Sequence, residues 1–115
     1  LGSSEKVGPY NFIGKIIEDL PTKELKPLAD KLRLNAVTTV ICLISVQDDK
    51  LSIVVSLSPD CEGKLDAVLL VRIASEAVGG KGGGGRFDMA QAGGSNPKDA
   101  FKAFEAVKTE LVSSK

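Results

Sequence analysis

Residues 36–58 read AVTTVICLISVQDDKLSIVVSLS and predict a β-hairpin. The first arm, residues 36–46, is rich in β-branched side chains, as expected of a buried strand. The polar residues 47–50 form the predicted turn, and residues 51–58 return with an alternating pattern. Two adjacent antiparallel strands are therefore expected here, with the other elements arranged around them.

The N-terminal part of the chain predicts a strand followed by a helix. Residues 1–6 are expected to form a flexible tail, and near-alternation of apolar residues predicts a first strand within residues 7–18. Apolar residues at helical spacing then predict a helix over residues 24–33. A start near Glu24 would leave Pro27 in the first turn, where a missing N–H group is tolerated.

The segment after the hairpin predicts a helix, a glycine-rich loop and a short strand. Residues 65–78 carry apolar side chains four positions apart and predict a helix. Residues 79–85 contain six glycines and one lysine. Because glycine loses much backbone entropy on ordering, neither helix nor strand is expected there. Residues 87–92 are a candidate strand.

The C-terminal end predicts one more helix. Residues 93–95 are expected to form a turn, and Asn96 is the predicted N-cap, with Pro97 at the first helical position. The predicted buried stripe of this helix is Phe101, Phe104, Val107 and Leu111. The element order predicts an α/β (α+β) domain over residues 7–115, with a mixed sheet of four to five strands and helices packed on it.

Composition narrows the function classes. The 115 residues are expected to form one domain, and 15 basic residues balance 15 acidic ones. A partner held by bulk electrostatics, such as long duplex DNA, is therefore not suggested. The sequence lacks histidine, the commonest general base and zinc ligand. Without an apolar run long enough for a membrane span or a secretory leader, a cytoplasmic location away from membranes is expected.

The two cysteines are not expected to form a disulfide. Cys42 lies in an apolar strand pattern and is expected to be buried. Cys61 lies in a Pro-Asp-Cys-Glu-Gly turn and is expected to be exposed. Two cysteines do not make a disulfide framework, and a leaderless chain indicates a reducing compartment.

Residues 78–94 read VGGKGGGGRFDMAQAGG. This run resembles the signature near the end of bacterial alanyl-tRNA synthetases, usually Gly-Gly-Lys-Gly-Gly-Gly-Arg-Pro-Asp-Met-Ala-Gln-Ala-Gly-Gly. The sequence departs from that pattern in two ways. Four glycines separate Lys81 from Arg86, and Phe87 stands where proline is usual. The order of elements along nearly the whole chain is compatible with the same family.

The resemblance implies the C-terminal (C-Ala, DHH-associated) domain of a bacterial alanyl-tRNA synthetase. Such a domain contacts the elbow of tRNA(Ala) and supports aminoacylation and editing in the full-length ligase. The implied partners are this tRNA, the rest of the synthetase chain and, in some members, a second copy that dimerises mainly through a preceding helical segment. The full-length enzyme is expected to use ATP, magnesium and zinc. No cofactor and no catalytic residue are expected in these 115 residues.

Two alternatives stay open. The same domain type accompanies DHH-family phosphoesterases such as RecJ, where it binds substrate. That assignment would call for a Gly-Gly-His type of motif, and the chain has no histidine. The second alternative is an interaction or dimerisation domain that touches no nucleic acid, and the zero net charge is its best support.

The candidate nucleic-acid contacts lie in and beside the glycine run. Glycine lets backbone N–H groups approach phosphate oxygens closely, and cations at the ends of the run add charge. The candidates are Gly80, Lys81, Gly82, Gly83, Gly84, Gly85, Arg86, Gln91 and Lys98. The competing interpretation of the run is a mobile surface loop with two solvated cations.

The neighbouring residues also have two interpretations each. Asp88 either orients Arg86 by a salt bridge or caps a turn, and Met89 is expected in the core. Lys98 lies four positions before Lys102, which indicates either a phosphate-contacting ridge or an ordinary solvated helix face. The paired acids at 48–49 and 18–19 are interpreted as turn residues. The spacing Gly80-x-Gly82-x-x-Gly85 fits a dinucleotide-binding pattern formally, but a helix precedes it and a strand follows, the reverse of what that fold needs.

Overall fold

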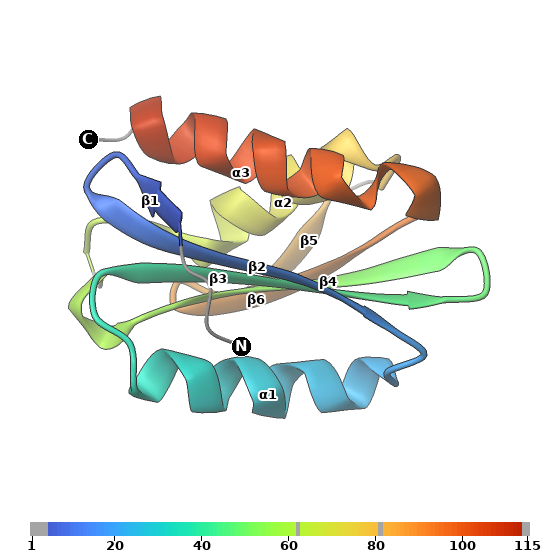
Figure 1. The fold of residues 1–115 in the computed structure, drawn as a ribbon, viewed down its shortest axis with the longest axis horizontal. Helices are drawn as coiled ribbons and strands as arrows, with labels where there is room; N and C mark the ends of the chain where they lie inside the picture. Colours follow the sequence, from blue (N-terminus) through green and yellow to red (C-terminus); the bar gives the residue numbers. More distant parts are fainter. Residues whose placement is uncertain (1–4, 62, 81, 114–115) are drawn as a thin grey trace.

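The computed structural model describes residues 5–61, 63–80 and 82–113. Within them, six strands form one mixed sheet in the order β1-β2-β3-β4-β6-β5, with helices on both faces (Figure 1). The elements in chain order are β1 (Glu5–Val7), β2 (Tyr10–Glu18), α1 (Thr22–Leu34), β3 (Thr39–Gln47), β4 (Lys50–Leu57), the 3-10 helix η1 (Pro59–Cys61), α2 (Ala67–Ala77), β5 (Gly83–Arg86), β6 (Met89–Gly94), the 3-10 helix η2 (Pro97–Asp99) and α3 (Ala100–Ser113). The predicted α+β class is confirmed, with six strands instead of four to five.

The predicted hairpin lies in the middle of the sheet. Strands β3 and β4 pair antiparallel, with Ile44 opposite Ile53. Strand β2 runs parallel to β3, because helix α1 carries the chain back along one face of the sheet. Helix α1 covers that face, and α2 and α3 cover the other (Figure 1). Both arms of the hairpin are therefore buried on both faces, which explains their nearly continuous apolar sequence.

Two hydrophobic cores separate the sheet from its helices. The core under α1 contains the buried residues Leu25, Ala29, Ile41, Leu43, Val54 and Met89. The larger core under α2 and α3 includes Phe12, Val40, Ile44, Ile53, Leu70, Val71, Val107 and Leu111. Alternate residues of each strand enter opposite cores, as the period of two requires. The two cores fix the sheet, and the sheet in turn positions its outer hairpin, β5–β6.

The N-terminal predictions need two corrections. Glu5 and Lys6 belong to strand β1, which pairs with β2, so they are not part of a tail. Helix α1 begins at Thr22, which places Pro27 in the helix interior and not in its first turn. Proline removes one helical hydrogen bond there. The complete burial of Leu25 and Ala29 against the sheet offsets that loss.

The glycine run was expected to be a loop, and this prediction is wrong for its second half. Residues Gly83–Arg86 form strand β5, and β6 extends through Gly94, so 93–94 are strand and not turn. Antiparallel pairing of β5 with β6 supplies hydrogen bonds that compensate for the entropy of ordering glycine. Local composition could not reveal this pairing, because the partner lies outside the run.

The start and the buried stripe of the last helix also differ from the prediction. Asn96 makes no side-chain cap hydrogen bond, and η2 precedes α3, which begins at Ala100. Phe101 is 55% exposed. The buried positions are Ala100, Ala103, Val107 and Leu111, with Phe104 partly buried. The small side chains of Ala100 and Ala103 face the sheet at the start of the helix. Phe101, one position after Ala100, therefore points away from the core.

Both cysteines are buried and free. The prediction for Cys42 is confirmed, whereas the exposure expected for Cys61 is wrong. The turn of η1 folds Cys61 inward, where its sulfur lies 3.5 Å from the Ser58 hydroxyl. Among the described residues, no helix has both the length and the apolar character needed to cross a membrane.

Candidate nucleic-acid interface

The β5–β6 hairpin forms one edge of the sheet and carries most of the candidate residues. Its turn is Phe87-Asp88, and Gly84 lies opposite Gln91 while Arg86 lies opposite Met89. Met89 is buried in the core under α1. Because side chains alternate along a strand, Gln91 points to the same side, and Gly84 and Arg86 share that side through pairing. This side of the hairpin is called the α1-side face below.

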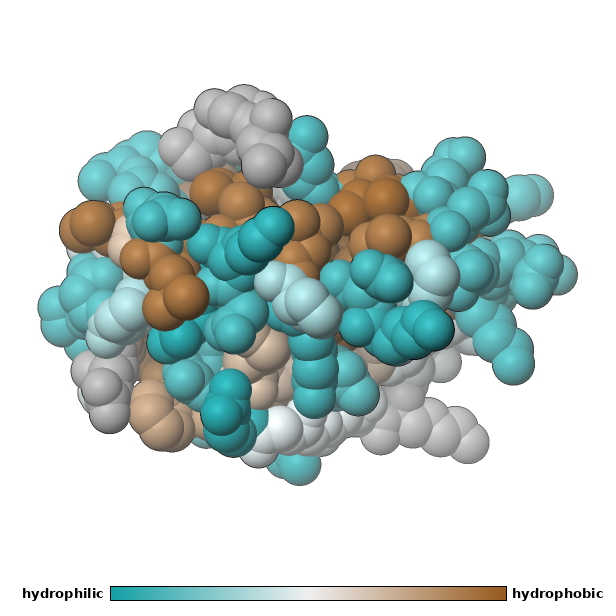
Figure 2. All heavy atoms as spheres, turned by 90° about the horizontal axis from the view of Figure 1, so that it is seen from below, coloured by the Kyte–Doolittle hydropathy of each residue, from teal (hydrophilic) through white to brown (hydrophobic). Residues whose placement is uncertain are grey.

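The α1-side face is open to solvent. Gln91, Gly84 and Arg86 are exposed, although Met89 between them is buried. Helix α1 packs mainly on β3 and β4, and Met89 is the residue of β5 and β6 that joins its core. Figure 2 views the molecule from the side that α1 covers, and polar residues dominate there between apolar patches. The face therefore combines exposed backbone with a cation and an amide.

The glycines of the run fall into two groups. A methyl group on Gly80, Gly83 or Gly85 would lie within 2.7 Å of backbone atoms of β6. These three glycines are needed for close packing of the run against β6. A methyl group on Gly82 or Gly84 would meet nothing within 4 Å. Packing therefore accounts for three candidates and leaves the backbone of the other two approachable from solvent.

Helix α2 covers the opposite side of β5. The Arg72 Nε atom donates a hydrogen bond to the Gly83 carbonyl oxygen at 3.0 Å. The Ala67 amide, at the start of α2, donates to the Phe87 carbonyl oxygen at 2.7 Å. These two bonds hold the edge strand against α2 at both ends. The hairpin is thus a supported element despite its glycine content.

Arg86 belongs to a cluster of three charged side chains. Its Nε atom lies 3.4 Å from Asp88 Oδ1, which confirms the predicted salt bridge. Asp88 Oδ2 lies 3.3 Å from a terminal nitrogen of Arg33, near the end of α1. The Arg33 Nε atom also donates to the Leu57 carbonyl oxygen at 2.8 Å. Asp88 thus lies between two arginines, one on the hairpin and one on a helix.

Arg33 was not among the predicted site residues. It lies 55 positions before Asp88 in the sequence, at the end of the predicted helix. Its side chain is only 15% exposed, although charged residues at a helix end are usually solvated. The sequence gives no local signal for this contact, because it depends on how α1 crosses the sheet.

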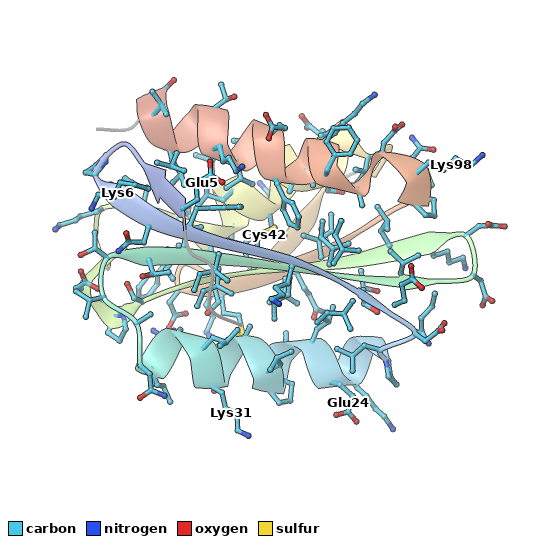
Figure 3. The ribbon with its side chains drawn as sticks, viewed as in Figure 1. Glu5, Lys6, Glu24, Lys31, Cys42 and Lys98 are labelled. Carbon is cyan, nitrogen blue, oxygen red and sulfur yellow. The ribbon has the colours of Figure 1, made fainter. Side chains whose placement is uncertain are left out.

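The remaining two candidates are separate from this cluster or undescribed. Lys98 lies in η2, beyond the far end of β6, at the end of the molecule opposite Lys6 in Figure 3. At roughly 3.3 Å per residue, β6 separates η2 from the Phe87-Asp88 turn by about 17 Å. Lys98 shares a hollow with Asp48, Asp49 and Asp99, which weakens its attraction for phosphate. Lys81 lies outside the described residues.

Three of the four acidic residues predicted in turns lie in turns, whereas Glu18 is the last residue of strand β2. Asp19 and Asp48 have positive φ angles of 62° and 54°, a conformation that aspartate tolerates at bends. Asp49 follows Asp48 in the β3–β4 turn. Within the described ranges, no cluster of three or more potential ligands could hold a metal ion.

Two charged groups away from the hairpin have shifted pKa values. The Thr38 hydroxyl and amide, followed by the Ser58 hydroxyl, donate hydrogen bonds to Asp60 and hold the pKa of its carboxyl well below the usual range. The Glu5 carboxylate, 2.8 Å away, raises the pKa of Lys108, and Glu105 adds a smaller effect. Lys108 also lies 5.5 Å from the Phe12 ring centroid. These groups stabilise a turn and the β1 edge, respectively.

Comparisons with known proteins agree with the fold and with the glycine run. Residues 10–113 match the family model described as the DHHA1 domain. The alanine–tRNA ligase of Chelativorans sp. (strain BNC1) is 45% identical over 109 residues, which cover 94% of this chain and 12% of that protein. The alanine–tRNA ligase of Paramagnetospirillum magneticum is 43% identical over 109 residues, covering 95% of this chain and 12% of that protein. The chain thus spans about an eighth of the length of these relatives.

A solved structure matches over its whole length. The crystal structure of the C-Ala domain from Aquifex aeolicus alanyl-tRNA synthetase superposes with a TM-score of 0.91 at 32% sequence identity, covering 96% of this chain and 99% of that one. The resemblance inferred from the glycine run is therefore confirmed. The chain belongs to the DHHA1 domain family and is a C-Ala domain of the alanyl-tRNA synthetase type.

Proposed function

We propose that this domain binds tRNA(Ala) at the elbow and thereby supports aminoacylation and editing in a full-length alanyl-tRNA synthetase. Membership of the C-Ala type supports this role. The observation that carries it is the α1-side face, where the unobstructed backbone of Gly84 lies between exposed Arg86 and Gln91. Bare backbone next to a cation is what a phosphodiester chain requires for close approach.

The three groups have complementary capacities for RNA. Arg86 offers a planar guanidinium that can pair with phosphate or stack on a base. Gln91 can both donate to and accept from a ribose hydroxyl or a base edge. Gly84 permits the strand itself to come near. Since the net charge of the chain is zero, affinity has to come from this local arrangement and from shape.

The chemistry of the ligase is proposed to reside elsewhere in the longer chain. We assign ATP, magnesium and zinc to the other parts of the full-length enzyme, and no cofactor to this domain. The partners proposed are tRNA(Ala), the preceding synthetase domains and a second copy of the enzyme. We also propose a cytoplasmic location, because the full-length enzyme would act on tRNA there.

Binding of labelled tRNA(Ala) by the domain, followed by fluorescence anisotropy at two salt concentrations, tests the proposal. Arg86→Ala should weaken binding by about tenfold and lower the salt slope by roughly 0.7–0.9, the value of one phosphate contact. Gln91→Ala should weaken binding without changing the slope. Lys31→Ala is the matched control, because Lys31 carries the same charge on α1 and points away from the sheet (Figure 3).

Three results would count against the proposal. Absence of saturable binding at low salt would favour an interaction domain that touches no nucleic acid. Equal effects of Arg86→Ala and Lys31→Ala would mean that the hairpin is not the binding surface. Preference for short phosphorylated single strands over tRNA would favour the phosphoesterase type of substrate domain.

A further inference from the structure

The Arg33–Asp88–Arg86 cluster suggests a role beyond a surface salt bridge, and this role rests on the proposed RNA binding. We infer that Asp88 and Arg33 are positioning residues, which hold the Arg86 guanidinium in the orientation that meets an RNA phosphate. Asp88 fixes Arg86, and Arg33 compensates the charge of Asp88 so that the carboxylate does not repel the phosphate.

The cluster is anchored to the central sheet through a single residue of β4. The Leu57 amide donates to the Asp88 carbonyl oxygen at 2.9 Å, which fixes the hairpin turn. The Leu57 carbonyl oxygen accepts from Arg33 Nε at 2.8 Å, which fixes the helix side chain. The Asp88 backbone and the Arg33 side chain are thereby both bound to Leu57, a residue of a buried strand. A carboxylate held from two directions has little freedom to follow a mobile arginine.

Exposure increases outward along the cluster. The side chains of Arg33 and Asp88 are 15% and 22% exposed, and that of Arg86 is 71% exposed. The inner ion pair is shielded from solvent and screened less than a surface pair. The outer arginine is presented to solvent. This order of exposure is expected if Arg33 and Asp88 position Arg86 for contact with a ligand.

The contact with Asp88 leaves much of the Arg86 guanidinium free. Asp88 engages it at Nε, at 3.4 Å, and not through the two terminal nitrogens of the fork. These two nitrogens form the fork that suits a phosphate. Asp88 Oδ1 is shielded from solvent and makes no hydrogen bond within the described residues, despite lying 3.4 Å from Arg86 Nε.

The charges of the three residues allow a test of the inference, because the two explanations predict opposite changes in tRNA affinity. The two arginines and one aspartate sum to one positive charge, so Asp88 alone subtracts from the attraction for RNA. If only bulk electrostatics mattered, Asp88→Asn would strengthen tRNA binding. If Asp88 positions Arg86, the same change weakens binding. Asp30→Asn is the matched control, since Asp30 lies 3.9 Å from Arg33 on exposed α1 surface and carries the same charge.

The first measurement uses the free protein and needs no RNA. The heteronuclear NOE of the Arg86 Nε–H group reports its mobility on the picosecond to nanosecond timescale. It should be high in the wild-type chain and in Asp30→Asn, and low in Asp88→Asn. A mobile Arg86 Nε–H group in the wild-type chain would overturn the inference whatever the binding data give.

The second measurement is a double-mutant cycle on tRNA(Ala) binding at low salt. Asp88→Asn should weaken binding by about threefold to tenfold, the range of one charge-assisted contact. In the Arg86→Ala background the same change should alter binding by less than about twofold, because there is nothing left to position. Arg33→Lys keeps the charge but loses the fork, and should give an intermediate loss. Urea unfolding of each variant identifies any that do not fold.

The outcomes separate the inference from the proposed function. Asp30→Asn removes one negative charge and should strengthen binding slightly. If Asp88→Asn also strengthens binding, the positioning role is overturned. Equal losses from Asp88→Asn with and without Arg86 would show a purely structural role and also overturn it. If the wild-type chain binds no tRNA while Arg86 is rigid, the proposed function fails first, and the phosphate as target of Arg86 fails with it.

Discussion

Replacing Gly80 by alanine should destabilise the fold without any RNA present. The added methyl group would lie 1.9 Å from the Ser75 hydroxyl oxygen and 2.2 Å from the Gly93 carbonyl oxygen. It would therefore displace the hydrogen bond that the Ser75 hydroxyl donates to Gly93 at 2.6 Å. The Ser75 hydroxyl can rotate, but the Gly93 carbonyl belongs to β6 and can move only with the strand.

The magnitude follows from two contributions. Forcing a methyl group into packed structure costs about 1–3 kcal/mol. Loss of one hydrogen bond costs about 1 kcal/mol more. The expected loss of unfolding free energy is roughly 2–4 kcal/mol, which corresponds to a fall in Tm of roughly 8–16 °C for a domain of this size. This loss is a large share of the 5–15 kcal/mol typical of a folded domain.

Gly84→Ala is the matched control on the same run. Its methyl group would meet nothing within 4 Å, so its effect on stability should stay within about 1 kcal/mol and can be favourable. Urea unfolding followed by circular dichroism measures both variants, with the midpoint shifting at constant m-value. Equal stability of Gly80→Ala and the wild-type chain, or equal losses in both variants, would refute the division of the glycines into packed and open groups.

Three further predictions concern groups away from the hairpin. Lys108→Met should lower the unfolding free energy by about 1 kcal/mol at pH 7. Because Glu5 raises the pKa of Lys108, this stabilisation is present while the lysine is charged and is lost as the pH rises above about 10.4. An unchanged unfolding free energy at pH 7 would contradict the prediction. Asp60→Ala should destabilise at pH 7, and the difference from wild type should shrink between pH 4 and pH 2, since a lowered carboxyl pKa contributes stability above its unfolded value; a constant difference would contradict it. Cys42 and Cys61 should resist Ellman's reagent until the chain unfolds, because both are fully buried and burial raises the pKa of Cys42 to about 12; rapid modification of the native chain would contradict their burial.

The central elements could be predicted because their signals are local and long. The predicted strands at 36–46 and 51–58 correspond to β3 (Thr39–Gln47) and β4 (Lys50–Leu57). Their β-branched, apolar sequence has one stable solution, a strand covered on both faces. Helix α2 could be predicted for a similar reason, since its apolar residues recur at helical spacing.

The elements that differ from the prediction depend on partners far along the chain. Strand β5 exists because β6 pairs with it and α2 covers it, and neither is visible in a run of glycines. Pro27 is tolerated inside α1 because the helix buries Leu25 and Ala29 against the sheet. In both cases tertiary contacts outweigh an unfavourable local preference.

The candidate site could be predicted in part for the same reason. The salt bridge between Arg86 and Asp88 spans two positions and was visible in the sequence. The support from Arg33 spans 55 positions and was not. Grouping Lys98 with the glycine run fits the start of the run, because Gly79 packs against Ser95 and Asn96, just before η2. In three dimensions the length of β6 separates Lys98 from Arg86.

Successive residues of β5 face opposite sides of the sheet, so its three glycines are explained by different physical reasons. Gly83 and Gly85 have no room for a side chain, because a methyl group would lie 2.5–2.7 Å from backbone atoms of β6. Gly84, between them, faces open solvent. Alanine at that position would fit and would reduce the entropy of the unfolded chain, so folding alone favours a side chain there. The proposed close approach of an RNA backbone gives a reason for glycine at 84 that packing does not supply.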